Sequence, residues 1–289
     1  NRGKISTSIH RDELLPNQLL RSTSEGQAMT PSDGPCMRVI INSDDLGMSP
    51  VVNEKILDLM SRRRITSASI LANGPSVEQA IRLIPKGTGC SLGVHLNLTE
   101  FEPLTPARHL GGLRAYLNEN GAFAGERNMS NLSISPSLRE GIYRELRLQV
   151  EKVVALGVKI SHLDSHNHVH TIPHVFPILK RLQREFGVRK VRTTWNIYPP
   201  QKPVSMALRI RKKVWDFSLR RLYRTRTTQG LTTFAIFYDL ARKEELSCSS
   251  IELMTHPGHA EYEEETRLLD RDWENEILFP VDLISYHAL

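Results

Sequence analysis

Five acidic and imidazole side chains of this chain stand at the ends of β-rich runs. They are Asp44, Asp45, His95, His166 and His256. Asp45, His95 and His166 would offer one oxygen and two nitrogens to a divalent cation and leave coordination positions for water and substrate. Asp44 and His256 would remain free to move protons. Such a set is typical of a metal-dependent hydrolase, in which the cation lowers the pKa of its water and flanking groups transfer protons.

The two aspartates are adjacent, in Asn-Ser-Asp-Asp-Leu-Gly at 42–47, directly after an apolar run. Taken alone, such a pair is better explained as turn residues or a helix N-cap. Beside a metal site, however, one carboxylate could bind the cation while its neighbour accepts a proton from the water.

Four histidines and an aspartate occur within nine residues, 162–170. A histidine-rich surface loop is the alternative, but the segment follows the apolar run 158–160 and precedes a helix signal, which favours metal binding. Only some of these imidazoles can reach one ion. We therefore expect Asp164, His168 and His170 to support the ligands or to contact substrate.

His256 belongs to Thr-His-Pro-Gly-His at 255–259, after the apolar run 251–254. Proline and glycine would also explain this segment as a simple strand-to-loop turn. A histidine there could instead donate a proton to a departing amine, because its pKa lies near the working pH. Arg192 is a candidate for orienting Asp44 or binding substrate, and a structural ion pair is an equal alternative.

The segments that must position these residues alternate between β-rich and helical patterns. Seven β-rich runs separated by helical ones predict a parallel α/β architecture. Parallel sheets gather catalytic groups at the carboxyl ends of their strands, so the candidate residues fit the mouth of a barrel. The runs are 38–42, 67–71, 90–98, 159–163, 189–194, 232–238 and 249–254.

Alternation in the third run gives a sharper prediction. One face carries Leu92, Val94, Leu96 and Leu98, and the other carries Gly93, His95 and Asn97. In a barrel the first face would pack beneath helices and His95 would point into the lumen.

Helix boundaries are signalled at three places. They are an N-cap and first-turn proline at Ser49 and Pro50, a capping box at Ser76 and Gln79, and a helix opened by Thr171 and Pro173 and closed by Gly187. The segment 99–135, rich in proline and glycine, is predicted to be a long loop bordering the substrate cleft.

The net charge of +6 is concentrated in 209–226, which could contact phosphate or an acidic polymer. The favoured interpretation is a solvated helix face, so we do not expect a nucleic-acid partner. The apolar residues predicted to point inward are Ile210, Val214, Trp215, Leu219 and Leu222.

Length and composition predict one large core at 37–289, after a polar extension at 1–36 with a short helix near 11–20. The absence of a long apolar run predicts no membrane partner. Three widely spaced cysteines, Cys36, Cys90 and Cys248, predict no disulfide and a reducing, cytoplasmic compartment. The sequence opens at Asn1 and not at Met, so an upstream leader could have been removed. Secretion therefore stays open as an alternative.

Taken together and in this order, the motifs closely resemble the YdjC-like carbohydrate deacetylase family. The resemblance runs from about Met37 to the C-terminus. It implies an irregular, TIM-like (β/α) barrel and metal-dependent removal of acetyl groups from N-acetylated sugars, with chito-oligosaccharides as the characterised substrate class. The segments that carry it are 42–47, Gly-Val-His-Leu-Asn at 93–97, His-Leu-Asp-Ser-His-Asn-His-Val-His at 162–170, Thr-His-Pro-Gly at 255–258 and Leu-Ile-Ser-Tyr at 283–286.

Carried over by motif, the resemblance implies roles for individual residues. Thr255 stands where many relatives have cysteine, which leaves the neighbouring histidine intact. One divalent cation is expected, Mg²⁺ or Zn²⁺, with Co²⁺, Ni²⁺ and Mn²⁺ also compatible, and a homodimer is compatible with the sequence. The implied metal ligands are Asp45, His95 and His166, the base is Asp44, the acid is His256, and the candidate substrate contacts are Asn97, His168 and Arg192.

Two other classes of protein remain open. A non-catalytic carbohydrate- or metal-binding protein on the same scaffold would have no need of Asp44. A ferrous oxygenase also uses two histidines and one carboxylate, but it would consume dioxygen, whereas deacetylation needs only water.

Overall fold

The computed structural model describes residues 36–125, 135–199, 204–243 and 246–289. The chain divides into Asn1–Gly34 and Pro35–Leu289, and only the second unit contains described residues. The short helix expected near 11–20 lies outside them. All three cysteines are free thiols, as predicted.

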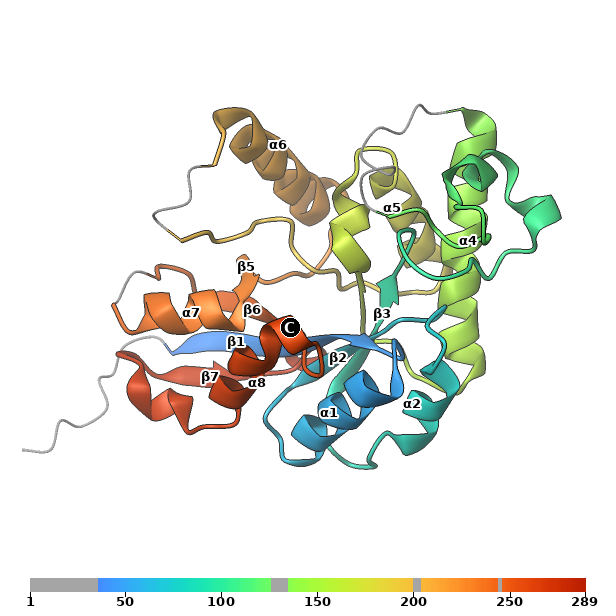
Figure 1. Ribbon diagram of the computed structural model, residues 1–289. Helices are drawn as coiled ribbons and strands as arrows, with labels where there is room; N and C mark the ends of the chain where they lie inside the picture. The colour runs from blue at the N-terminus through green and yellow to red at the C-terminus, as the bar shows by residue number, and fades with distance from the viewer. Residues whose placement is uncertain (1–35, 126–134, 200–203, 244–245) are drawn as a thin grey trace, which may run out of the picture. The chain divides into compact units, whose positions relative to one another are not determined.

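A sheet of parallel strands forms the centre of the fold (Figure 1). Its order is β4-β3-β2-β1-β6-β5, and β7 pairs with the first residues of β1. The predicted parallel α/β class is therefore confirmed. The strands are β1 (Met37–Leu46), β2 (Ser67–Ile70), β3 (Ser91–Leu96), β4 (His162–Ser165), β5 (Gly230–Thr233), β6 (Ser250–Thr255) and β7 (Val281–Leu283).

The two outer strands, β4 and β5, are linked by an irregular segment. Leu163 of β4 pairs with Val191, and Asn196 pairs with Leu231 of β5, each through an isolated parallel bridge. The curled sheet is thus an irregular, TIM-like barrel, as expected. The prediction of a full strand at 189–194 was wrong, because this segment changes partners within a few residues and forms no continuous ladder.

Helices follow the strands along the chain. A π-helical turn, Ser218–Leu222, extends one of them. The helices are α1 (Pro50–Ser61), α2 (Val77–Leu83), α4 (Pro136–Ala155), α5 (Phe176–Glu185), α6 (Met206–Phe217), α7 (Phe234–Ala241) and α8 (Glu263–Leu269).

The predicted helix boundaries had mixed outcomes. The Ser49 hydroxyl accepts a hydrogen bond from the Val52 amide at 3.2 Å, so this N-cap is confirmed. Ser76 precedes α2 but makes no capping hydrogen bond, so the capping box was wrong. The helix expected from Thr171 begins later, at Phe176, because the preceding residues form 3₁₀ turns.

The predicted strand at 232–238 was correct only at its start. The strand β5 ends at Thr233, whose hydroxyl accepts a hydrogen bond from the Ile236 amide and caps α7. The β-branched and aromatic residues of 232–238 favour a strand by propensity, but the N-cap at Thr233 starts a helix instead. The three-residue strand β7 was not predicted.

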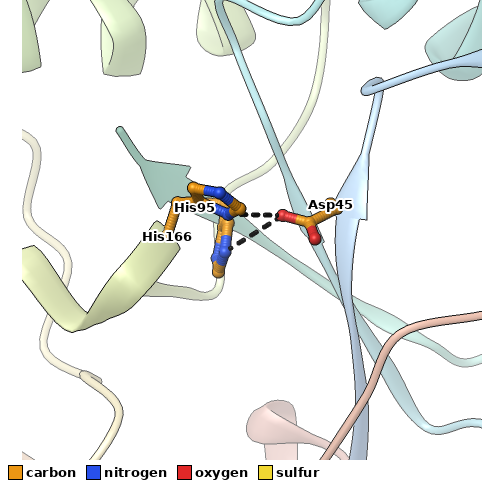
Figure 2. Close-up of side chains that lie close together, drawn as sticks. All are labelled: Asp45, His95 and His166. Atoms are coloured by element: carbon orange, nitrogen blue, oxygen red, sulfur yellow. Dashed lines mark hydrogen bonds and ion pairs between the residues drawn. The ribbon is translucent and has the colours of Figure 1, made fainter. Parts of the chain in front are cut away.

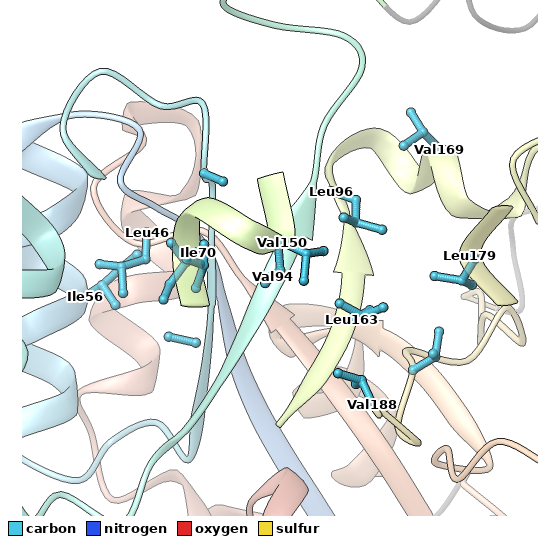
Figure 3. Close-up of a cluster of buried hydrophobic side chains, with 14 of the residues drawn as sticks. Leu46, Ile56, Ile70, Val94, Leu96, Val150, Leu163, Val169, Leu179 and Val188 are labelled. Atoms are coloured by element: carbon cyan, nitrogen blue, oxygen red, sulfur yellow. The ribbon is translucent and has the colours of Figure 1, made fainter. Parts of the chain in front are cut away.

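The main apolar core lies between the sheet and its covering helices (Figure 3). This core includes Val94 and Leu96 of β3, Val150 of α4, Leu163 of β4 and Leu179 of α5, all labelled in Figure 3. All five are fully buried. The predicted apolar face of the third run therefore packs beneath helices.

The segment after β3, predicted to be a long loop, is partly helical and partly buried. Two short 3₁₀ helices, Ala107–His109 and Gly111–Tyr116, lie in it, and Leu113 is fully buried. Gly141 of α4 approaches so closely that a Cβ there would lie 2.1 Å from the Leu110 carbonyl oxygen. The part before residue 126 is thus packed against the fold rather than being an open loop.

The burial of Leu179 predicts a loss of stability on truncation, which an exposed leucine can control for. Replacing buried Leu179 by alanine should lower the free energy of unfolding by about 2–5 kcal/mol, because it removes apolar contacts and leaves a cavity. The same change at Leu83, 57% exposed in α2, should cost less than about 0.5 kcal/mol. Urea unfolding of both variants tests this, and equal losses would contradict the packing described.

Candidate active site

A bulge at the end of β1 turns two neighbouring carboxylates toward one cavity. Adjacent side chains of a regular strand point to opposite faces. Between Ser43 and Leu46, however, the register of β1 against β2 shifts, and Asp45 has a left-handed φ of 68°. Bulges redirect side chains in this way near active sites. Asp44 and Asp45 consequently both line a cavity of about 500 Å³.

The cavity collects most of the predicted site residues. His95 comes from β3 and His256 follows β6, while His166 and His168 lie in the turn after β4. Among the described residues, Glu100 is the member of the predicted cleft-bordering segment 99–135 that lines this cavity.

Three side chains converge as a metal site requires (Figure 2). Asp45 Oδ1 lies 2.8 Å from His166 Nδ1 and 3.4 Å from His95 Nε2. One ligand atom from each residue lies within 4.8 Å of the others. Two imidazoles and one carboxylate match the donor preferences of several divalent metals. The three residues therefore fit a divalent cation.

The pKa shifts of His166 and Asp45 also fit a cation site. Burial lowers the pKa of His166, but hydrogen bonds to Asp45 and Glu100 outweigh burial and raise that pKa to about 10. Burial raises the pKa of Asp45, yet hydrogen bonds from His166 and His259 hold it well below its usual value. The carboxylate thus attracts positive charge from several sides, as an anionic ligand of a cation would.

His95 is fixed by a neighbour on its other side. Its Nδ1 donates to Asp164 Oδ1 at 2.9 Å, which leaves Nε2 facing Asp45. A carboxylate behind a histidine is a common means of setting the tautomer of a metal ligand. Asp44, His95 and Asp164 form a second potential cluster, but a cation there would also meet the charge of Arg192, so the first cluster fits better.

Asp44 is held by Arg192. The guanidinium donates to both carboxylate oxygens, at 2.6 and 2.8 Å, and is fully buried. Burial raises the pKa of Asp44, but the charges of Arg192 and His95 outweigh it and leave the pKa below its usual value. Asp44 is consequently ionised and directed by a rigid bidentate contact.

Arg192 also contacts two other buried carboxylates. Its Nη2 lies 2.8 Å from Asp164 Oδ2, and its Nε donates to Glu252 at 2.8 Å. Tyr286 donates to the other oxygen of Glu252 and stacks on His162 at 3.7 Å. Burial raises the pKa of Glu252 to about 7, although Arg192 opposes that shift. This network links the C-terminal segment to Asp44.

His256 also lies near Asp44, with its Nε2 3.8 Å from Asp44 Oδ2. Its ring stacks on Tyr262 at 4.6 Å. Burial lowers the pKa of His256, although Asp44 and Asp45 oppose the shift. The geometry leaves His256 close to the carboxylates and facing the cavity.

The predicted substrate contacts have different surroundings. His168 lines the cavity. Asn97 is fully buried, and its side chain bonds to Asn73 and to the turn at 99–100, so it does not line the cavity. Arg192 is also fully buried, so its contacts match the alternative role of orienting Asp44. His170 is fully buried and contacts Ser165, and it is not among the residues that line the cavity.

Sequence reasoning missed three residues that shape the site. His259 Nε2 lies 3.4 Å from Asp45 Oδ2, and Glu100 lies 3.3 Å from His166 Nε2. The position of His259, three residues after His256, was a usable signal. Glu252 was signalled by its place within an apolar strand. Glu100 had no comparable signal.

Residues 38–283 match the family model described as YdjC-like protein. A protein of Geobacillus stearothermophilus named carbohydrate deacetylase is 37% identical over 158 residues, which cover 53% of this chain and 60% of that protein. A carbohydrate deacetylase of Listeria monocytogenes serotype 4b (strain CLIP80459) is 28% identical over 227 residues, covering 77% and 82%. The chain thus spans about 60% of the length of the first of these relatives.

A solved structure shows a similar fold. It is a protein of Enterococcus faecalis V583, provisionally named a cellobiose-phosphate cleavage protein, with a TM-score of 0.65 and 19% identity over 88% of this chain and 98% of that chain. At this identity the likeness concerns the fold alone. The family model, however, matches nearly the whole described chain, and we conclude that this chain belongs to the YdjC-like protein family.

Proposed function

We propose that this chain is a metal-dependent deacetylase of N-acetylated carbohydrates. The observation that carries the proposal is the placement of Asp44, ionised and held by Arg192, beside the cluster of Asp45, His95 and His166. A site that only binds a metal or a sugar needs no buried carboxylate of this kind next to its ligands. The names of the relatives support the same reaction class.

The residues divide the chemistry between them. Asp45, His95 and His166 would hold the cation, which when bound polarises the acetamide carbonyl and acidifies a water. Asp44 accepts the proton of the attacking water, because Arg192 keeps its carboxylate ionised. His256, whose Nε2 lies 3.8 Å from Asp44 Oδ2, donates a proton to the departing amine nitrogen. Acetate and a free amino sugar are the products.

The surroundings of the cavity support a substrate larger than one sugar. A second cavity of about 630 Å³ adjoins the first and shares Thr233, Glu261 and Tyr262 with it. Tyr262, stacked on His256, offers an aromatic surface where the two cavities meet. We propose chito-oligosaccharide-type substrates, with Mg²⁺ or Zn²⁺ as the cation.

Acetate release tests the function directly. We expect release from N-acetylated oligosaccharides in the presence of added divalent metal, and more from the disaccharide than from monomeric N-acetylglucosamine. A chelator should abolish release, and exclusion of dioxygen should not. Release that persists with chelator would contradict the metal requirement, and no release from any sugar tested would contradict the deacetylase.

The adjacent aspartates provide a matched pair of variants. Asp44→Asn should retain cation binding but lower turnover on the order of 10² to 10⁴-fold, because it removes a proton acceptor. Asp45→Asn should weaken cation binding by more than about tenfold, since it removes the charged ligand itself. Calorimetric metal titration and acetate release separate the two effects. Undiminished turnover in Asp44→Asn would rule out its role as base.

The contact between Arg192 and Asp44 predicts a change in pH dependence. Arg192→Lys keeps the charge but loses the bidentate geometry, so it should stabilise the Asp44 carboxylate less and let its pKa rise. Because Asp44 acts only when ionised, activity should be lost at a higher pH on acidification than in the unmodified protein. The measurement is kcat/KM against pH.

A suitable control is Arg62→Lys, which alters an arginine paired with Asp58 and Asp270 on the surface. This control should leave the pH profile unchanged. An unmoved acid limb in folded Arg192→Lys protein would show that Arg192 does not set the ionisation of Asp44.

A further inference from the structure

The helix α6 exposes a continuous apolar stripe. The inward packing predicted for Ile210, Val214 and Leu222 was therefore wrong, whereas that of Trp215 and Leu219 is confirmed. Met206 is 69% exposed, Ile210 56%, Val214 51% and Phe217 58%. Their spacing of four, four and three residues places them on one helix face. Leu222, in the π-helical turn that follows, is 67% exposed.

The opposite face of α6 attaches the helix to the rest of the fold. Trp215 stacks on Phe176 of α5 at 4.9 Å and donates from Nε1 to the Thr171 carbonyl oxygen at 2.8 Å. Leu219 is fully buried. The face that carries Trp215 and Leu219 is therefore the one that packs against the core. The exposed stripe needs another explanation, since large apolar side chains gathered on one exposed face typically mark an interaction site.

Cations border the stripe on both edges. Helical geometry places Arg209 and Lys213 along one edge and Arg211 along the other, and all three are exposed. Residues 204–226 contain eight lysines and arginines but a single acidic residue, Asp216, which pairs with Arg220 at 2.8 Å. An apolar centre between basic edges is the pattern of helices that lie in the surface of an anionic membrane.

We propose that α6 docks on an anionic lipid surface, with Met206, Ile210, Val214 and Phe217 entering the acyl boundary and the bordering cations contacting the headgroups. This surface function goes beyond the proposed deacetylase activity and does not rest on it. It also differs from a membrane span: among the described residues, no helix is long and apolar enough to cross a bilayer.

Other occupants fit the charges less well. In a symmetric dimer through α6, the basic edges of one copy would lie close to those of the other, and like charges would repel. A nucleic acid would neutralise the cations but leave the apolar stripe in water. A lipid surface accommodates both the cations and the apolar stripe, because long basic side chains reach the headgroups while apolar side chains enter the acyl region.

Vesicle flotation with the full chain tests the proposal. At low salt, we expect binding to vesicles of equimolar phosphatidylglycerol and phosphatidylcholine, and little binding to phosphatidylcholine alone. Ile210→Ser with Phe217→Ser should reduce partitioning by about tenfold or more, because it removes the apolar contact. Arg209→Gln with Lys213→Gln should reduce it by about fivefold for each cation removed.

Matched changes elsewhere are the controls. Leu83→Ser with Leu278→Ser removes two leucines that are similarly exposed, and Arg82→Gln with Lys86→Gln removes two exposed cations. Both controls should bind like the unmodified protein, and thermal unfolding should show that every variant remains folded.

Three outcomes would overturn the proposal. They are no binding to the anionic vesicles, binding that the α6 variants leave unchanged, and a dimer in sedimentation velocity that Ile210→Ser with Phe217→Ser dissociates. The last would identify a second copy as the occupant. The first outcome, together with capture of an acidic protein through the stripe, would replace the membrane with a protein partner.

Discussion

The site depends on one buried cation, the guanidinium of Arg192. Three carboxylates from three strands, Asp44 of β1, Asp164 of β4 and Glu252 of β6, lie within hydrogen-bond distance of it. Without a cation, so many buried carboxylates could not all stay ionised, because each charge carries a large desolvation cost. Arg192 therefore sets both the position and the charge of the residues beside the cavity.

This arrangement gives adjacent aspartates different environments. Asp44 faces the guanidinium, which is permanently charged and cannot give up a proton. Asp45 faces His95, His166 and His259, which can release protons when a metal binds. Neighbouring groups that differ in this way can take different parts in a reaction. The bulge in β1 makes this possible, since a regular strand would send one of them to the other face.

The sequence predicted the parts of the site that follow from local pattern. Alternation placed His95 in the lumen, and the end of an apolar run placed Asp44 and Asp45 at a strand terminus. The left-handed conformation of Asp45 was not predictable, because it depends on the pairing of β1 with β2. Nor could the sequence choose between the roles of Arg192, whose partners come from distant strands.

The error at α6 has a different origin. Periodicity showed that α6 has an apolar face, but it could not tell whether that face meets the core or the solvent. The structure attaches the helix through Trp215, which contacts Thr171 at the end of the turn that carries His166 and His168. The exposed stripe and the wall of the cavity thus share a support without sharing side chains. Changes to Ile210 or Phe217 can therefore alter the surface while the contacts of His166 with Asp45 and Glu100 remain.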